Sequence, residues 1–385
     1  MTHAKLVLGL LLSILLFTSG CLEDETSLED ETSEIEVEKV VEGLASPWAI
    51  NFVPDMDYAL VTESSGELVL IDTSNGDIER FSGVPEVDDT GQGGLMDIEV
   101  HPDYPENEWV YMTYTDSNED GIATHVGRAE LDLETQELEN FEVLHVAEPF
   151  QDGGQHFGSR IVFDDEDYLF VTSGDRGDKN FDDHVSQDTL NELGATLRLN
   201  EDGEIPSDNP FVDDDEVADS IYSYGHRNSQ GMTVHNGEIW QSEHGEEDGD
   251  EINIIEEGGN YGWPITHTGC EYGTDSPVGE DPFENPDVVD PVYYWECNTG
   301  GFPPAGMTFY SGEAFSEWED DLFIGNLAGQ YLGHFEVDDE DVEEKEPLLE
   351  EDEWRIRDVA EEPSTGYLYV VVDGDDAPLV KITPE

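Results

Sequence analysis

The sequence predicts an all-β fold, and more specifically a six-bladed β-propeller, on three observations. Helical periodicity is scarce along the whole chain. Pairs of short β-rich segments, joined by glycine-containing or acidic turns, recur six times at irregular intervals of about 45–83 residues. No helical pattern separates these pairs, so six consecutive β-meanders are the simplest arrangement. A β-sandwich is the alternative, but its strands would be more closely spaced and would not repeat as units.

Each unit opens with a segment of β-branched and aromatic residues that alternates or runs apolar, as a half-buried strand does. The opening segments start at Tyr58, Trp109, Tyr168, Ile239, Leu322 and Tyr367. The longest insertions lie at 175–238 and 258–320, where glycine, proline, histidine and arginine concentrate. Since propellers build their sites from long loops at the mouth of the central channel, these insertions predict where the site lies.

The first 38 residues are predicted to be a targeting segment and a tether. Residues 6–17 form an apolar run that is too short to span a bilayer and suits a signal peptide. Cys21 follows Thr18-Ser19-Gly20, which resembles a lipobox. We therefore expect residues 1–20 to be a lipoprotein signal peptide and Cys21 to anchor the exported protein to the outer face of the cell membrane. The alternative is a simple signal peptide with a chance cysteine.

Residues 21–38 are acidic, rich in serine and threonine and free of aromatic side chains. This composition predicts a flexible tether and leaves residues 39–385 for the propeller.

The charge of the chain is extreme, with 96 acidic and 13 basic residues and a net charge of −83. Disorder is one interpretation, but 36% hydrophobic content, 10% aromatics and seven tryptophans favour a packed core. The better interpretation is an acidic shell adapted to molar salt, where the Debye length falls to about 3 Å. The acidity therefore predicts a halophilic source. It also argues against nucleic acid as a partner, because no basic patch is available to neutralise phosphates.

Two cysteines follow Cys21 in the chain. Because an exported chain meets an oxidising compartment, Cys270 and Cys297 are candidates for a disulfide, and two buried thiols are the alternative. Neither cysteine has the spacing of a zinc site.

The few cations mark candidate binding residues. Arg176, Arg227, Arg355 and Arg357 occur in glycine-rich or alternating segments, and alternation places Arg355 and Arg357 on one face of a strand. Arginine binds carboxylates in a bidentate manner, so three guanidinium groups facing the channel would bind a polyanionic ligand. The alternative is that each arginine pairs with one of the many acidic residues.

Two further segments carry candidate chemistry. His156 precedes a strand and Asp175 follows the next one, and a histidine oriented by a carboxylate can act as a general base. A hydrogen-bonded structural histidine is the alternative. The acidic, glycine-rich segment 241–253 could supply oxygen ligands to Ca²⁺, although it lacks the EF-hand spacing.

Together these segments resemble the soluble aldose/glucose dehydrogenase (glucose/sorbosone dehydrogenase) family that uses pyrroloquinoline quinone (PQQ). The resemblance extends from about Val40 to Ile382 and rests on motifs at 44–48, 91–95, 101–104, 156–158, 174–177, 224–231, 250–253, 259–264 and 355–358. Each motif alone is weakly specific, but their order and the last few together, such as Tyr224-Gly225-His226-Arg227-Asn228-Ser229-Gln230-Gly231, Gly259-Asn260-Tyr261-Gly262-Trp263-Pro264 and Arg355-Ile356-Arg357-Asp358, are highly specific.

The resemblance implies a six-bladed propeller that oxidises the anomeric hydroxyl of aldose sugars to lactones with PQQ and calcium, and passes electrons to an external acceptor. It implies that His156 is the catalytic base and that Asp175 orients it. The quinone-binding positions that it implies are Gln92, Arg227, Asn228, Arg355 and Arg357. The calcium at the quinone would be bound by the carbonyls of Gly245 and Glu246, and a second calcium by Glu251 and the carbonyl of Tyr261.

The sequence departs from the family pattern at two positions. Ala328 stands where the family usually has a lysine against the quinone, and Glu246 stands where it usually has a proline. The departures leave open a non-catalytic cell-surface propeller that binds a sugar or a protein. A calcium-dependent lactonase is a third possibility, but it would need a calcium deep in the channel, held by side-chain carboxylates.

Overall fold

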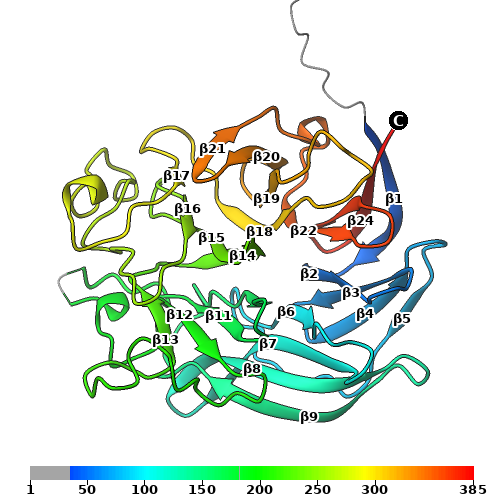
Figure 1. Ribbon diagram of the computed structural model, residues 1–385, viewed down its shortest axis with the longest axis horizontal. Helices are drawn as coiled ribbons and strands as arrows, with labels where there is room; N and C mark the ends of the chain where they lie inside the picture. Colours follow the sequence, from blue (N-terminus) through cyan, green and yellow to red (C-terminus); the bar gives the residue numbers. More distant parts are fainter. Residues whose placement is uncertain (1–34, 182) are drawn as a thin grey trace, which may run out of the picture.

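The structure, a computed structural model, describes residues 35–181 and 183–385. Six four-stranded antiparallel sheets are arranged around a central axis, which confirms the predicted six-bladed propeller (Figure 1). The predicted signal peptide, the lipid-anchored Cys21 and the start of the tether lie outside the described residues. None of the helical segments in the described part of the chain is long and apolar enough to cross a membrane.

Each blade runs from an innermost strand at the axis to an outermost strand at the rim. The first three blades hold β2 (Pro47–Phe52), β3 (Tyr58–Glu63), β4 (Glu67–Asp72) and β5 (Ile78–Arg80); β6 (Leu95–Val100), β7 (Trp109–Asn118), β8 (Gly121–Asp132) and β9 (Glu137–Val146); and β10 (Ile161–Phe163), β11 (Leu169–Ser173), β12 (Ala195–Leu199) and β13 (Ile221–Tyr224). The next two hold β14 (Ser229–His235), β15 (Glu238–Glu243), β16 (Glu251–Ile254) and β17 (Tyr293–Tyr294); and β18 (Pro304–Phe309), β19 (Leu322–Asn326), β20 (Tyr331–Asp338) and β21 (Asp341–Glu344). Three short 3₁₀ segments, Val185–Gln187, Pro282–Glu284 and Glu350–Asp352, lie in the connections.

The sixth blade closes the ring with both ends of the described chain. Its strands are β22 (Ile356–Glu362), β23 (Tyr367–Val372), β24 (Ala377–Pro384) and, at the rim, β1 (Ile35–Leu44). Ile35 pairs with Pro384 and Glu38 with Lys381, and the two strands lie side by side in Figure 1. In the described part of the chain, Ile35–Glu38 is therefore part of this strand pair, although these residues were predicted to belong to the tether.

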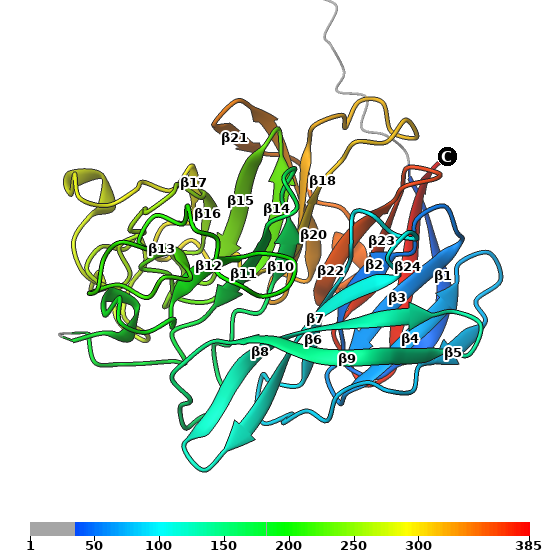
Figure 2. The ribbon, with the colours of Figure 1, turned by 60° about the horizontal axis from the view of Figure 1, so that its bottom comes forward.

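Apolar side chains fill the space between neighbouring blades. The largest of these clusters joins the sixth blade to the first and fifth through residues such as Val61, Phe323 and Val370, all fully buried. Burial on both faces of a blade explains why its middle strands are almost continuously apolar. The long connections at 175–220 and 255–300 extend from one side of the ring, as Figure 2 shows for the loops around β12, β13, β16 and β17.

A buried charge cluster ties the blades together at the axis. Arg160 Nη1 contacts Asp97 Oδ1 at 3.0 Å and Asp358 Oδ2 at 3.1 Å, so three innermost strands or their approaches share one guanidinium. The same carboxylates accept backbone N–H groups from Ile161 and Ile50, and Arg160 Nε donates to the carbonyl of Gln230. In the fifth blade, a Cβ at position 306 would lie 1.5 Å from the Asp358 carboxylate, so only glycine fits. All six blades thus meet at this cluster.

The cluster also divides the central channel. On the side where the innermost strands end, the channel opens into a cavity of about 670 Å³ lined by residues such as Glu99, Phe163, Met307 and Glu361. Burial raises the pKa of Asp97 to about 7 and that of Glu99 to about 8, with neighbouring carboxylates adding to the shift at Glu99. The predicted site residues lie on the other side, where the innermost strands begin.

Candidate active site

His156 and Asp175 form the core of the candidate site. His156 Nδ1 lies 2.6 Å from Asp175 Oδ1, and Asp175 Oδ2 accepts a 2.9 Å hydrogen bond from the indole nitrogen of Trp263. Burial alone would raise the pKa of Asp175, but the hydrogen bond from His156 and the positive charge of Arg227 hold it below its ordinary value. Because an ionised carboxylate only accepts, Nδ1 carries the proton and Nε2 keeps its lone pair. The pair can therefore act as an oriented base.

The backbone around His156 is fixed by its neighbours. His156 has a left-handed φ of 49°, and a Cβ at position 174 would lie 2.2 Å from its carbonyl oxygen. Gly174 is therefore required for the two segments to meet, which explains why a glycine precedes Asp175. Gln92 Oε1 accepts the backbone N–H of His156 at 2.8 Å, so this predicted quinone-binding residue also positions the base.

Arg176 has a different role from the other arginines that were predicted to bind a ligand. Its guanidinium donates to the carbonyls of Gln155, Ile122 and Gly153 and lies 3.9 Å from the ring centre of Phe157. Burial lowers its pKa to about 10. Arg176 therefore clamps the loop that carries His156.

Arg227, which is buried, and Arg357, which is mostly buried, are cations with incomplete pairing. The Nη2 atom of Arg227 contacts Glu246 Oε2 at 2.8 Å, and its Nη1 donates to the carbonyl of His244. Arg357 Nη1 donates to the neutral side chain of Gln230 at 3.0 Å, and its nearest carboxylate contact is 3.9 Å long, to Asp373. Burial lowers the pKa of Arg357, the expected penalty for an uncompensated charge away from water.

His244 lies next to Arg227, whose Nη1 donates to its carbonyl. Its side chain is partly buried, with Nε2 2.6 Å from the carbonyl of Pro304, and desolvation lowers its pKa to about 3. The guanidinium of Arg227 lies 5.2 Å from the ring centre of Trp263, whose indole nitrogen donates to Asp175. Arg357 contacts Gln230, three residues along the chain from Arg227, so both arginines lie near the His156–Asp175 pair.

Arg355 lies at the edge of the group. Its Nε donates to Asp373 at 3.0 Å and its Nη1 to the carbonyl of Leu327 at 2.9 Å. Leu327 precedes Ala328, so a guanidinium reaches the loop in which the resembling family has a lysine. With a side chain that is 44% exposed, Arg355 is less constrained than Arg357.

The buried donors that have no partner among the described residues include Arg227 Nε and Asn228 Nδ2 on this face. The Oδ1 atom of Asn228 accepts from the N–H of Gly158, which directs the amide nitrogen away from that strand. Buried donors are rarely left unpaired in proteins, so these atoms indicate a missing acceptor. A ligand with several carboxylates fits this donor set, which includes the predicted quinone-binding residues Arg227 and Asn228.

The predicted calcium ligands Gly245 and Glu246 lie in a tightly bonded loop. The N–H of Gly245 donates to Asp250 Oδ1, and the N–H of Glu246 donates to His267 Nε2. No donor within residues 35–181 and 183–385 contacts either carbonyl oxygen. In the same residues, no group of three or more His, Cys, Asp or Glu side chains is placed to hold a metal. A cation here would rest on main-chain carbonyls, which Ca²⁺ accepts readily.

Glu251 and Tyr261, the second predicted calcium pair, line one small cavity of about 10 Å³ with Glu243 and His267. The buried carboxylate of Glu251 receives one long hydrogen bond, 3.3 Å from Thr268 Oγ1, and lies 3.6 Å from His267 Nδ1. The structure thus brings this pair together and leaves the carboxylate weakly compensated.

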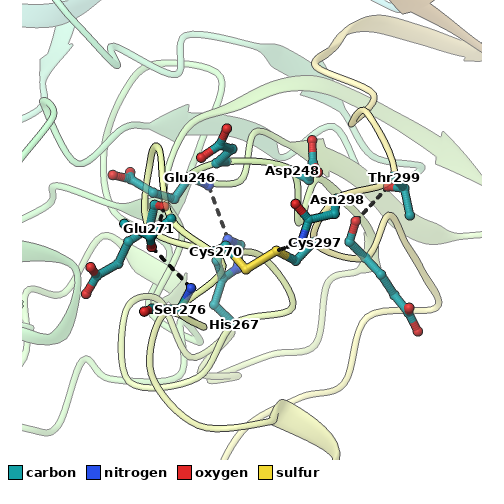
Figure 3. The surroundings of a disulfide bond; sticks show 12 residues. Glu246, Asp248, His267, Cys270, Glu271, Ser276, Cys297, Asn298 and Thr299 are labelled. Carbon is teal, nitrogen blue, oxygen red and sulfur yellow. Dashed lines mark hydrogen bonds between the residues drawn. A yellow bond between two sulfur atoms is a disulfide. The ribbon is translucent and has the colours of Figure 1, made fainter.

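A disulfide holds the loop beside this region. Cys270 and Cys297 are bonded, as the structure and Figure 3 show, so the disulfide interpretation is confirmed. Cys270 also exchanges backbone hydrogen bonds with Glu247, at 3.1 and 3.0 Å. Through these hydrogen bonds, the disulfide-closed loop 270–297 is attached to the acidic segment 241–253, which contains the predicted calcium ligands.

Sequence reasoning missed three contributors to the site: Trp263, Gln230 and His244. Trp263 and Gln230 lie inside motifs that had been recognised, but nothing in the sequence says that an indole donates to Asp175 or that an amide accepts from Arg357. His244 lies within the acidic segment 241–253, where its neighbours suggested only calcium. Their roles come from contacts between blades.

Comparison with known proteins gives a consistent result. A family model described as Glucose / Sorbosone dehydrogenase matches residues 44–381. Aldose sugar dehydrogenase YliI of Escherichia coli (strain K12) is 36% identical over 354 residues, which cover 91% of this chain and 93% of that protein.

Solved structures show the same similarity. The apo-form of the soluble aldose sugar dehydrogenase from Escherichia coli matches with a TM-score of 0.85 and 35% identity, covering 91% of this chain and all of the other. The PQQ-bound form of an aldose sugar dehydrogenase from Streptomyces coelicolor matches with a TM-score of 0.73 and 26% identity, covering 92% of this chain and 99% of the other.

Proposed function

Because the chain belongs to the glucose/sorbosone dehydrogenase family, we propose that it is an aldose sugar dehydrogenase that uses PQQ and calcium. The observation that carries the proposal is the oriented His156–Asp175 pair beside buried, unpaired guanidinium and amide donors. The PQQ-bound relative supports the choice of cofactor. The sugar would be oxidised at its anomeric hydroxyl to a lactone, and an external acceptor would take the electrons.

In this reaction His156 Nε2 takes the proton of the anomeric hydroxyl. Asp175 stabilises the imidazolium that forms, and Trp263 holds the other carboxylate oxygen in place. When bound, PQQ supplies the acceptor for the hydride of the anomeric carbon. The proton and the two electrons of the oxidation thus leave the sugar by separate routes.

The remaining site residues would hold the cofactor. Arg227, Arg355 and Arg357 suit its three carboxylates, with Asn228 and Gln92 as neutral partners. The carbonyls of Gly245 and Glu246 would bind the calcium beside it, and Glu251 with the carbonyl of Tyr261 would bind a second calcium. A divalent ion there would also offset the acidic loop 246–251.

An absorbance titration of the purified protein with PQQ and Ca²⁺ in molar KCl tests this proposal. We expect a saturable spectral change that an aldose reverses, and dye-linked sugar oxidation that needs both additions. Quinone uptake without oxidation of any aldose in a broad panel would refute the enzyme. Sugar binding that is unchanged in His156→Ala, with no quinone uptake, would favour the non-catalytic propeller.

We further propose that the protein is exported, works in molar salt and is held to the outer face of the cell membrane by lipidated Cys21. The position of Cys21 after an apolar segment supports the anchor, and the net charge of −83 supports the high-salt setting. Expression of Cys21→Ser in a halophilic host should move the protein from the membrane fraction to the medium. Equal membrane retention of both forms would contradict the anchor.

A further inference from the structure

Lys179 differs from the other lysines in the described part of the chain. Lys39, Lys345 and Lys381 pair with glutamates whose side chains are 60% exposed or more, on β1, β20, β21 and nearby segments. Lys179 instead contacts Glu246, whose side chain is only 5% exposed. An acidic chain with few cations has therefore placed one ammonium group against a buried carboxylate of the candidate site.

The contact brings two cations from different blades to one oxygen. Glu246 Oε2 accepts from Lys179 Nζ and from Arg227 Nη2, the latter at 2.8 Å. Lys179 comes from the loop after β11, and Arg227 from the approach to β14. Two cations therefore share one carboxylate oxygen beside the unpaired Nε of Arg227.

The loop that carries Lys179 is held by contacts of its own. The N–H of Asp178 donates to the carbonyl of Asp175, and Asp178 Oδ2 accepts from the N–H of Val185. The aromatic rings of Phe181 and Tyr272 lie on the path of the lysine side chain, 5.8 and 5.7 Å from Nζ. Lys179 is therefore presented from the same segment as Asp175, while its side chain stays 53% exposed and open to a ligand.

From this geometry we propose that Lys179 binds the redox cofactor directly. With Arg227 it forms a two-cation clamp for one carboxylate of the quinone, and Glu246 is the counter-ion of the clamp in the ligand-free protein. The inference rests on the proposed function, because it takes PQQ as the anionic ligand. Lys179 is a binding residue in this proposal and has no part in proton transfer.

The test is the affinity for PQQ, measured by absorbance titration of the full-length protein with Ca²⁺ in molar KCl. At this salt concentration the Debye length is about 3 Å, so only a direct contact of Lys179 would change the affinity appreciably. Loss of one charge-assisted hydrogen bond in Lys179→Met should raise the Kd at least about 10-fold, and Lys179→Arg should restore it to within about 3-fold. Lys381→Met, which removes a lysine far along the sixth blade, is the matched control and should leave the Kd unchanged.

The outcomes separate this inference from the function on which it rests. Saturable binding by the wild type, with a Kd for Lys179→Met within about 2-fold of it, would overturn the clamp and leave the dehydrogenase proposal standing. Absence of quinone uptake by the wild type would overturn both. Matching thermal unfolding of the wild type and Lys179→Met would show that a weakened affinity is not a folding defect.

Discussion

The contacts of Asp175 allow the effect of Asp175→Asn to be worked out in detail. The side chain is 1% exposed and accepts from three donors, with His156 Nδ1 and the N–H of Gly177 at Oδ1 and Trp263 Nε1 at Oδ2. An asparagine has one acceptor oxygen and one donor group, so one of these positions must receive an NH₂. Oδ1 accepts two hydrogen bonds and Oδ2 accepts one, with His184 Nε2 farther away at 3.5 Å, so the amide oxygen should face His156 and the NH₂ should face Trp263.

Two consequences follow from this orientation. The His156 tautomer is kept, but the imidazolium loses its counter-charge, and loss of general-base assistance predicts a fall in kcat of about 10²–10⁴-fold. The indole N–H of Trp263 is left facing another donor, which should destabilise the fold by about 1–3 kcal/mol. PQQ affinity should change little, because neither oxygen of Asp175 is hydrogen-bonded to a guanidinium group.

The assay is dye-linked aldose oxidation at saturating PQQ and Ca²⁺, with urea unfolding at constant KCl for stability. Trp263→Phe added to Asp175→Asn removes the unmatched donor, so the double variant should be more stable than Asp175→Asn and equally inactive. Asp275→Asn, at an exposed position, controls for the loss of one negative charge. A kcat for Asp175→Asn within about 3-fold of the wild type would refute the assignment of His156 as an Asp175-oriented base.

Three further predictions concern stability. Arg160→Met leaves the buried carboxylates of Asp97 and Asp358 without their cation and should lower the free energy of unfolding by about 3–5 kcal/mol in urea titrations, and a loss below about 1 kcal/mol would contradict the axial role of the cluster. The raised pKa values of Asp97, about 7, and Glu99, about 8, mean that the folded protein holds these protons more tightly than the unfolded chain. Their contribution to the free energy of unfolding is therefore complete below about pH 4 and is lost as the pH rises through 7 to 8. Glu99→Gln should make this loss of stability smaller and should unfold at a higher urea concentration than the wild type at pH 8.5. Glu106→Gln, at an exposed position, should unfold like the wild type. Replacement of Cys270 and Cys297 by serine opens a loop closed over 27 residues and should cost about 3 kcal/mol of unfolding free energy, together with weaker Ca²⁺ binding by the loop that Cys270 holds; an unchanged midpoint would exclude a stabilising role.

The strands that were predictable are those whose pattern is set by burial on both faces. The six opening segments correspond to β3, β7, β11, β15, β19 and β23, the second strand of each blade. The rim strands escaped prediction because they are short or exposed: Ile78–Arg80 is exposed throughout, and Tyr293–Tyr294 has two residues. The strand Ile35–Leu44 carries mostly exposed side chains and is defined by its pairing with β24, which no local pattern reveals.

The candidate site follows the same distinction. The motifs predicted His156, Asp175, Arg227 and Arg357 as site residues, because few residue types can abstract a proton near neutral pH or bind a carboxylate in a bidentate manner. The interaction of Glu246 with Arg227 was not predictable, since a glutamate in a chain with 96 acidic residues looks like surface charge. Only the meeting of two blades shows that this glutamate is buried and that Arg227 is its partner.

The contacts of Arg160 and Arg357 explain why Arg357 has no close carboxylate partner. Gln230 accepts from both, with its carbonyl facing Arg160 and its side-chain oxygen facing Arg357, and Trp48 lies 4.7 and 6.0 Å from the two guanidinium carbons. The carboxylates of Asp97 and Asp358 both pair with Arg160, and neither pairs with Arg357. Arg357 is thus left with no carboxylate closer than Asp373, at 3.9 Å, which is what its proposed role in binding the carboxylates of the cofactor requires.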